Sequence, residues 1–124
     1  MGGFNAYVGN LLVDPAAGAD DAARFAFVPE AKHLNGGGAL HGGLLMTLAD
    51  NVLGTVAHSR LEGKVASTVT LNVDFLAGGD LSAPVRGGAQ ITRATRSLLF
   101  VSGALTQGDR MLVTATGIWK VIGV

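Results

Sequence analysis

Hydrophobic and polar residues follow two different periods along this chain, and the period changes near residue 60. From Gly42 to about Ser59, apolar side chains occupy nearly every face of a helical repeat. This pattern predicts one long helix that is buried on all sides. From Lys64 to Leu76, apolar and polar residues alternate, as they do in a strand with one buried face and one solvent-facing side.

Strict alternation assigns each residue of the 64–76 strand to one of two faces. The expected apolar face carries Val65, Val69, Leu71, Val73 and Phe75, and the expected polar face carries Lys64, Thr68, Thr70, Asn72 and Asp74. The turn residues that follow at 77–80 end the strand.

Three more strands are predicted after this one, at 85–93, 98–106 and 111–122, with a tight hairpin turn at Gly108-Asp109. Because short turns join strands that pair antiparallel, we expect the last four strands to form a meander.

The chain before the long helix is less regular. Two short strands are predicted at 11–13 and 24–28, and a weak helix or turn at 3–9. A twisted antiparallel sheet wrapped around one central helix would bury the apolar faces of both. We therefore predict an α+β fold in one domain, residues 1–124, since a chain of 124 residues has no room for two.

Charge and composition exclude several classes of partner. Nine basic and nine acidic residues give a formal net charge of zero, which argues against binding to nucleic acid or to an anionic membrane. Charged residues make up only 15% of the chain, so we expect a second chain to cover part of its apolar surface. The absence of cysteine excludes disulfides and a cysteine nucleophile.

The N-terminal residues do not resemble a secretion signal, because no basic segment precedes an apolar one. No apolar run approaches the roughly 18 residues that a membrane span requires. We therefore expect a soluble, cytoplasmic protein.

Candidate chemistry concentrates between His33 and Asp50. A glycine-rich loop there leads into the predicted helix, and Asp50 is the one carboxylate in that helix. Glycines let backbone N–H groups at a helix start face a ligand, where the helix dipole favours developing negative charge. An oxyanion-binding helix terminus and a carboxylate are two groups that acyl transfer uses.

The pattern of residues in this segment resembles that of a known family, the hotdog-fold acyl-CoA thioesterases related to 4-hydroxybenzoyl-CoA thioesterase and the phenylacetate-pathway thioesterase. The strand at 67–76 also resembles the strand that follows the helix in this family. The resemblance covers about residues 4–122 and implies the hotdog fold, a sheet wrapped around one long helix. The pattern in this chain consists of Asn35, Gly38, His41, Gly42, Gly43 and Asp50.

The resemblance implies a role for each matching residue. Asp50 corresponds to the catalytic carboxylate, and the Gly42 N–H to the group that polarises the thioester carbonyl. Asn35 corresponds to the amide that helps to hold the carbonyl or the attacking water, and Thr68 to a hydroxyl that orients this water. His41 belongs to the motif and is expected to shape the helix entry rather than act as a base.

Further residues are assigned to substrate binding or depart from the family pattern. Gly43 lies at the helix entry, and Arg93 and Arg96 flank a predicted turn where they could contact coenzyme A phosphates, although a solvated turn is the alternative for each.

Many relatives have a proline where Gly36 stands. Some have a hydroxyl residue where Gly54 stands, which leaves Thr68 as the candidate for holding water.

Helix geometry predicts that two chains form each site. Gly42 and Asp50 are separated by roughly 12 Å along a helix that rises about 1.5 Å per residue. One chain cannot place both groups on the same thioester. We therefore expect a homodimer with shared active sites, and two such dimers are expected to form a tetramer. The choice between dimer and tetramer stays open, because it depends on which face of the sheet packs.

The predicted function is hydrolysis of an acyl-CoA, aromatic or of medium chain length, to a free acid and coenzyme A. Asp50 would act as nucleophile or general base, and the sequence leaves both open. The alternatives are a hotdog dehydratase or hydratase that uses His41, a non-catalytic acyl-CoA-binding module, and, least favoured, a structural interaction protein. No cofactor is predicted. No metal is predicted either, because His33, His41 and His58 lack the spacing of a metal site.

Overall fold

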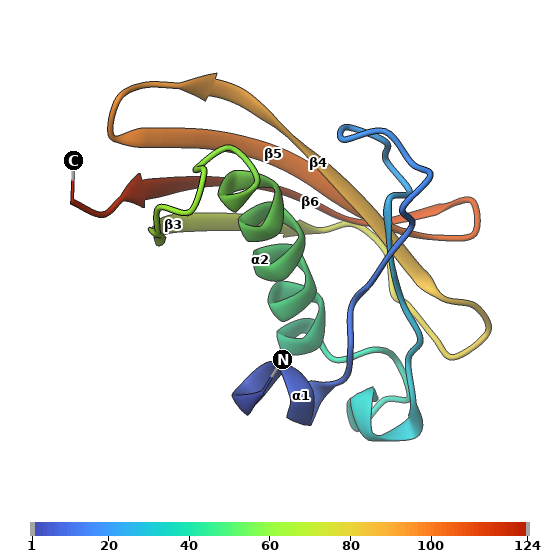
Figure 1. Cartoon of the computed structure of the whole chain (residues 1–124). Helices are drawn as coiled ribbons and strands as arrows, with labels where there is room; N and C mark the ends of the chain where they lie inside the picture. The colour runs from blue at the N-terminus through green and yellow to red at the C-terminus, as the bar shows by residue number, and fades with distance from the viewer. Residues whose placement is uncertain (1, 124) are drawn as a thin grey trace.

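The computed structural model describes residues 2–123 of the chain. Within this range the structure has two helices, a 3₁₀ turn and six strands (Figure 1). In chain order they are α1 (Gly3–Val8), β1 (Leu12–Val13), β2 (Phe25–Phe27), the 3₁₀ turn (Ala31–His33), α2 (Gly42–His58), β3 (Ala66–Phe75), β4 (Val85–Ala94), β5 (Leu98–Gln107) and β6 (Arg110–Val121). Each predicted element is therefore confirmed, with ends that differ by one or two residues.

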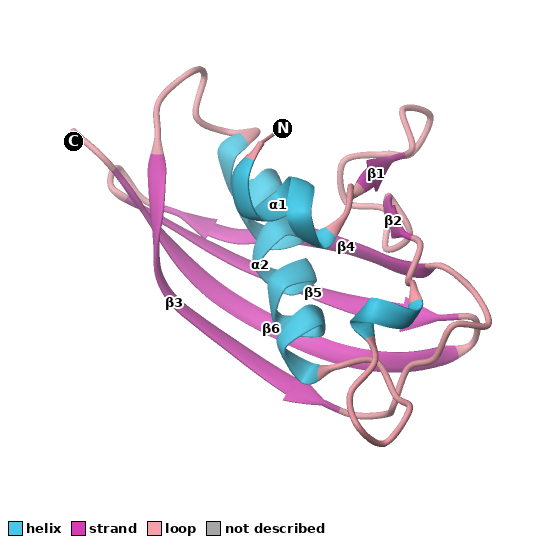
Figure 2. Cartoon of the chain, turned by 90° about the horizontal axis from the view of Figure 1, so that it is seen from below, coloured by secondary structure: helices cyan, strands magenta, loops and turns pink. Residues whose placement is uncertain are grey.

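The strands form one antiparallel sheet in the order β1-β2-β4-β5-β6-β3, and α2 crosses one of its faces (Figure 2). The core lies between the helix and the sheet, where Leu48, Val52 and Leu53 of α2 face Val101 and Val113 of the strands, all almost fully buried. Burial of these side chains supplies the main driving force for this packing. A curved antiparallel sheet around one long helix is the hotdog fold.

The predicted meander is wrong for its first strand. β3 pairs with β6 rather than with β4, and β4 pairs with β2 on its other side. The cause is the connection formed by residues 76–84. It is too long for a tight hairpin, and it carries the chain from the β3 edge past β6 and β5 to the position of β4. Gln107 holds this crossing segment: its buried amide donates to the carbonyls of Asp80 and Ala83 and accepts from the Asp80 N–H.

Strict alternation along β3 is also wrong, because a bulge interrupts the strand. Thr68 pairs with Trp119 and Thr70 with Ile118, so Val69 has no partner on β6. A bulge moves the following residues to opposite faces. Thr68 therefore faces α2 while Thr70 faces away from it, and the side chain of Val69 is 59% exposed rather than buried.

The expectation that α2 is buried all round needs a similar correction. One side of the helix packs on the sheet, but Gly43, Met46, Thr55 and His58 are exposed on the other. Asp50 belongs to this open side, where it is partly exposed. The carboxylate can therefore stay hydrated, and it does not lie in the apolar core.

The N-terminal segment packs beside α2, where the side-chain amide of Asn51 donates to Asn5 Oδ1 of α1. His33 of the 3₁₀ turn is buried, accepts from the Glu30 N–H at Nδ1, and hydrogen-bonds the Val8 carbonyl through Nε2. Within residues 2–123, no helix has the length and apolar character to cross a membrane.

Candidate active site

The N-terminus of α2 is capped by the side chain of the residue before it. His41 Nδ1 accepts a hydrogen bond of 2.8 Å from the Gly43 N–H. A neutral imidazole that accepts at Nδ1 carries its proton on Nε2. His41 therefore presents an N–H donor to solvent, and the Gly43 N–H is already used by the cap.

The Gly42 N–H is different, because it makes no hydrogen bond to any residue between 2 and 123. The first N–H groups of a helix lack intrahelical partners and lie at the positive end of its dipole. Gly42 lines a cleft of about 380 Å³ together with Asn35 and Phe75. A small acceptor, such as a carbonyl oxygen, can approach the Gly42 N–H from this cleft.

Asn35 shapes the loop that forms one wall of the Gly42 cleft. Its Oδ1 accepts hydrogen bonds from the N–H groups of Gly37 and Ala39, at 2.9 and 3.1 Å. The oxygen is thus used as in an Asx turn. The Nδ2 amino group makes no hydrogen bond within the described part of the chain, so it remains a donor for a ligand. Turn formation and ligand contact are therefore compatible at this residue.

Asp50 and Thr68 meet in a second cleft, of about 330 Å³, between α2 and the first half of β3. The Thr68 hydroxyl donates to Asp50 Oδ1 across 3.2 Å. No Lys, Arg or His among residues 2–123 forms an ion pair with this carboxylate. The cleft is lined by Asp50, Asn51, Gly54, Thr55, His58, Ala66, Thr68 and Trp119.

The expected site residues thus fall into two separate groups. Phe75, at the end of β3, lines the Gly42 cleft, whereas Ala66, at the start of β3, lines the Asp50 cleft. The continuous helix α2 separates Gly42 from Asp50 by roughly 12 Å along its axis. A single chain therefore does not bring the helix N-terminus and the carboxylate to one thioester.

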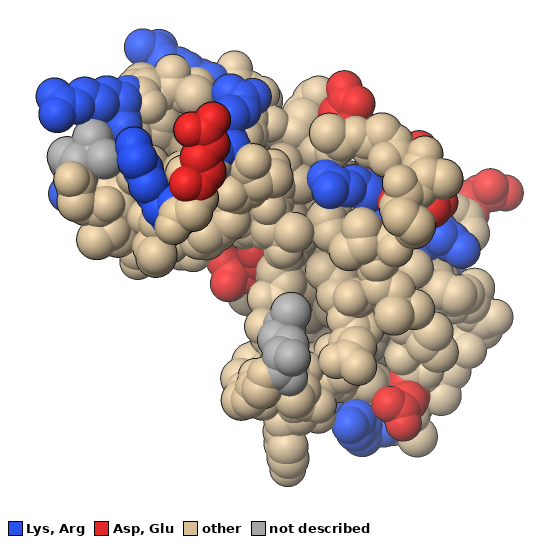
Figure 3. All heavy atoms as spheres, in the orientation of Figure 1, with Lys and Arg blue, Asp and Glu red and all other residues tan. Residues whose placement is uncertain are grey.

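Arg93 and Arg96 lie in neither cleft. Arg93 is in the last part of β4 and Arg96 in the turn to β5, and both are exposed. Figure 3 shows Lys and Arg side chains gathered at the end of the molecule that carries this turn. The same end of the sheet carries the start of β3, because Leu98 and Ser67 both pair with Lys120 of β6.

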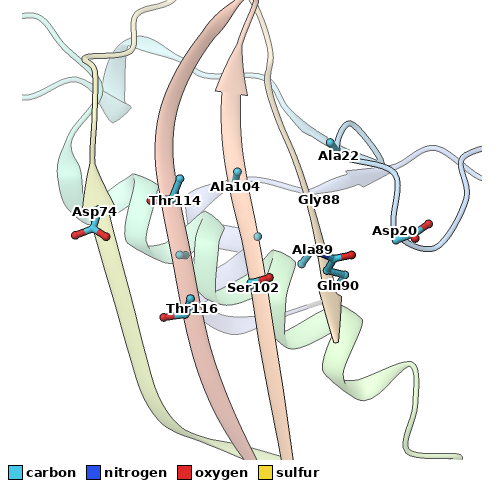
Figure 4. A pocket seen from close by; sticks show the side chains of 12 residues that line it. Asp20, Ala22, Asp74, Gly88, Ala89, Gln90, Ser102, Ala104, Thr114 and Thr116 are labelled. Carbon is cyan, nitrogen blue, oxygen red and sulfur yellow. The ribbon is translucent and has the colours of Figure 1, made fainter. Parts of the chain in front are cut away.

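Another hollow, of about 430 Å³, lies on the face of the sheet away from α2 (Figure 4). Its floor is a row of paired residues in which Thr114 and Ala104 lie between Asp74 of β3 and Gly88 of β4. The loop residue Asp20 borders its far side. None of the expected catalytic residues lines this hollow.

Sequence reasoning missed Trp119 as a site residue. The side chain of this residue, the single tryptophan of the chain, is only 2% exposed. It nevertheless lines the Asp50 cleft. The pairing of Trp119 with Thr68 across the bulge could have revealed this placement, but only once the register of β3 and β6 was known.

The family model of the thioesterase superfamily matches residues 37–114, which include the start of α2, Asp50 and Thr68. This chain belongs to the thioesterase superfamily. The match begins inside the glycine-rich loop and ends in β6. It therefore covers the helix and most of the sheet.

Individual relatives agree with this assignment. A proposed esterase of Pseudomonas aeruginosa is 33% identical over 93 residues, which are 74% of this chain and 69% of that protein. A proposed thioesterase of Ralstonia eutropha, described as related to phenylacetic acid degradation, is 31% identical with a TM-score of 0.74, over 78% of this chain and 74% of that one. A Streptococcus mutans protein solved with bound acetyl-CoA is 26% identical with a TM-score of 0.73, over 80% and 79%.

Proposed function

We propose that this protein is an acyl-CoA thioesterase whose active site is completed by a second copy of the chain. The observation that carries this proposal is that two complementary clefts lie apart, at opposite ends of β3 and beside α2. One cleft offers the Gly42 N–H, which has no acceptor among residues 2–123, and the other offers the Asp50 carboxylate with Thr68. Family membership and the acetyl-CoA-bound relative support an acyl-CoA as the substrate.

The position of β3 supports a homodimer. It is an edge strand of the sheet, and Val69, Phe75 and the adjacent Leu76 are each more than half exposed. An exposed edge strand presents unpaired backbone N–H and C=O groups, and proteins usually cover such a strand. If two copies of β3 pair antiparallel about a twofold axis, the start of one strand lies beside the end of the other. The Asp50 cleft of one subunit then meets the Gly42 cleft of its partner, at two equivalent sites.

In the composite site, the thioester carbonyl oxygen would accept a hydrogen bond from the Gly42 N–H of one subunit. The neighbouring Asn35 Nδ2 and His41 Nε2–H are donors that can add to it. Donors aimed at the developing oxyanion lower the barrier most because the charge appears only in the transition state. Asp50 of the other subunit would then act on the carbonyl carbon or on an attacking water.

Coenzyme A would extend from this site toward the basic end of the molecule. Arg93 and Arg96, which are both exposed, are the residues that we propose for contact with its phosphates. An aromatic or medium-chain acyl group, a dimer-of-dimers tetramer and a cytoplasmic location stay predictions. We also propose that residues 1–124 form a single domain.

The hydratase alternative is less favoured by the geometry. A catalytic base needs a free lone pair, but His41 Nδ1 is occupied by the Gly43 N–H, and the other ring nitrogen carries the proton. His41 is thus set up as a cap and a donor.

The experiment that tests the proposal measures coenzyme A release from a panel of aromatic and aliphatic acyl-CoAs with a thiol reagent. The chain contains no cysteine, so the protein adds no background. We expect turnover by the wild type and a loss of about 1,000-fold in Asp50→Ala. Asp74→Ala is the matched control, because Asp74 is an exposed carboxylate on the other face of the sheet.

Two results would contradict the proposal. A wild-type rate of coenzyme A release by the Asp50→Ala variant would show that Asp50 has no role in the mechanism. Tight binding of acyl-CoAs without turnover of any of them by the wild type would instead identify a binding module.

A further inference from the structure

Trp119 of β6 lies against α2 at the edge of the Asp50 cleft. Its side chain is 2% exposed, yet it lines the Asp50 cleft, and its partner on β3 is Thr68. Directly paired residues in an antiparallel sheet project from the same face. Trp119 and Thr68 therefore reach toward α2 side by side.

The indole ring abuts α2 at Gly54. A Cβ placed on Gly54 would lie 3.6 Å from Trp119 Nε1 and 3.8 Å from Cζ2. Gly54 is about one helical turn after Asp50 and so lies on the same side of the helix. The space that a side chain at position 54 would fill is thus bordered by the N–H edge of the indole.

The indole N–H has no hydrogen-bond partner among residues 2–123. Every side-chain nitrogen or oxygen that is sealed from solvent within this range does have one. Trp119 Nε1 is therefore not sealed in but opens to the cleft that it lines. A tryptophan N–H in a buried ring normally finds an acceptor, so its partner here should come from outside the chain.

We propose that the Trp119 N–H holds the attacking water beside Asp50. The indole N–H is a donor only, so it can bind a water solely through an oxygen lone pair. That arrangement leaves one O–H of the water to donate to Asp50 and the second lone pair to attack the thioester. Trp119 is thus a positioning residue, and this inference rests on the proposed thioesterase function.

The resulting step balances without any further reactant. The water oxygen bonds to the thioester carbon, and its proton passes to Asp50. The tetrahedral intermediate then expels the coenzyme A sulfur with the electron pair of the C–S bond. Asp50 returns the proton to that sulfur, and the products are a carboxylic acid and coenzyme A. Asp50 acts here as a general base, one of the two roles that the sequence left open.

The sharpest test replaces the indole N–H and nothing else. Because the chain has one tryptophan, incorporation of 3-benzothienylalanine in place of tryptophan changes only position 119. This analogue exchanges the N–H for a sulfur in a ring of nearly the same shape. We expect kcat to fall about 10- to 100-fold, as for the loss of one hydrogen bond to the reacting water. KM and the melting temperature should stay close to those of the wild type.

A genetic variant gives an independent readout. Trp119→Phe also removes the N–H, and it opens space beside Gly54. The double variant Trp119→Phe with Gly54→Ser supplies a hydroxyl from the helix in place of the indole N–H. We expect the double variant to regain at least about tenfold of the lost kcat, whereas a purely structural role of Trp119 predicts no gain.

The outcomes separate this inference from the function on which it rests. If the wild type hydrolyses acyl-CoAs, Asp50→Ala does not, and the benzothienyl protein keeps the full kcat, then only the role of Trp119 is refuted. If the wild type hydrolyses no acyl-CoA, both the function and the inference fall.

Discussion

Thr68 Oγ1 lies 3.2 Å from Asp50 Oδ1, and this hydrogen bond joins β3 to the open side of α2. The contact depends on the bulge at Val69, which turns Thr68 toward the helix although Thr70 faces the opposite side of the sheet. Bulges often re-aim a side chain near an active site. Here the bulge brings a hydroxyl to the proposed catalytic carboxylate.

The first prediction concerns the Thr68 hydroxyl. Thr68→Val keeps the shape of the side chain but leaves Asp50 without its donor, so we expect kcat to fall about tenfold. Thr68→Ser restores the hydroxyl and should keep most of the activity. Steady-state kinetics with the best acyl-CoA compares the two. Equal rates for the valine and serine variants would show that the hydroxyl has no part in turnover.

The second prediction isolates one backbone N–H. Gly42→Pro removes the proposed oxyanion donor at the first position of α2, where proline is well tolerated in helices. His41 already has φ −62° and ψ 136°, which suits a residue before proline. We expect kcat to fall about 100- to 1,000-fold, the usual loss for an oxyanion-hole donor.

Gly42→Ala is the matched control for this proline. It keeps the N–H, and its Cβ would make an ordinary contact with the Phe75 ring at 3.5 Å. The alanine variant should therefore retain activity. A proline variant that folds and matches the alanine variant in kcat would rule out the Gly42 N–H as the oxyanion donor.

The third prediction concerns pH and the segment that crosses between β3 and β4. The pKa of Asp80 lies below its usual value of 3.8, because Ser82 donates to its carboxylate from both hydroxyl and backbone N–H and Arg110 pairs with it. A lowered pKa in the folded state adds stability above pH 3.8, and this stability is lost as the pH falls through the folded-state pKa.

Asp80→Asn should therefore melt at a lower temperature than the wild type at neutral pH, and the difference should shrink below about pH 4. Thermal unfolding followed by circular dichroism across this range measures it. A difference that is constant with pH would mean that ionised Asp80 does not stabilise the crossing segment.

The sequence predicted the elements well because their signals are local. The helix at Gly42–His58 and the strands up to Val121 follow from periodicity and from turn residues such as Gly108, which has a φ of 58°. The pairing of β3 with β6 was missed because it depends on contacts distant in sequence. The buried Gln107, which holds the crossing segment, is one of them.

The candidate site was likewise predictable only where its signals are local in sequence. The loop at Asn35, the helix start at Gly42 and the carboxylate of Asp50 are recognisable as a motif in sequence. The switch of face at Thr68 was not, because it arises from a bulge that no residue near Val69 signals. The approach of Trp119 to Gly54 was not either, because it is a contact between residues distant in sequence. The exposure of one side of α2 was also not predictable, because it depends on which helix residues the sheet covers.

The central claim is that each active site combines Asp50 of one subunit with the Gly42 N–H of the other, and mixed dimers test it most directly. Asp50→Ala and Gly42→Pro subunits carry different affinity tags, and each homodimer should be inactive. A random mixture should recover about a quarter of the wild-type activity, because half of its dimers hold one intact site out of two. Purified mixed dimers that stay as inactive as the parents would contradict the account.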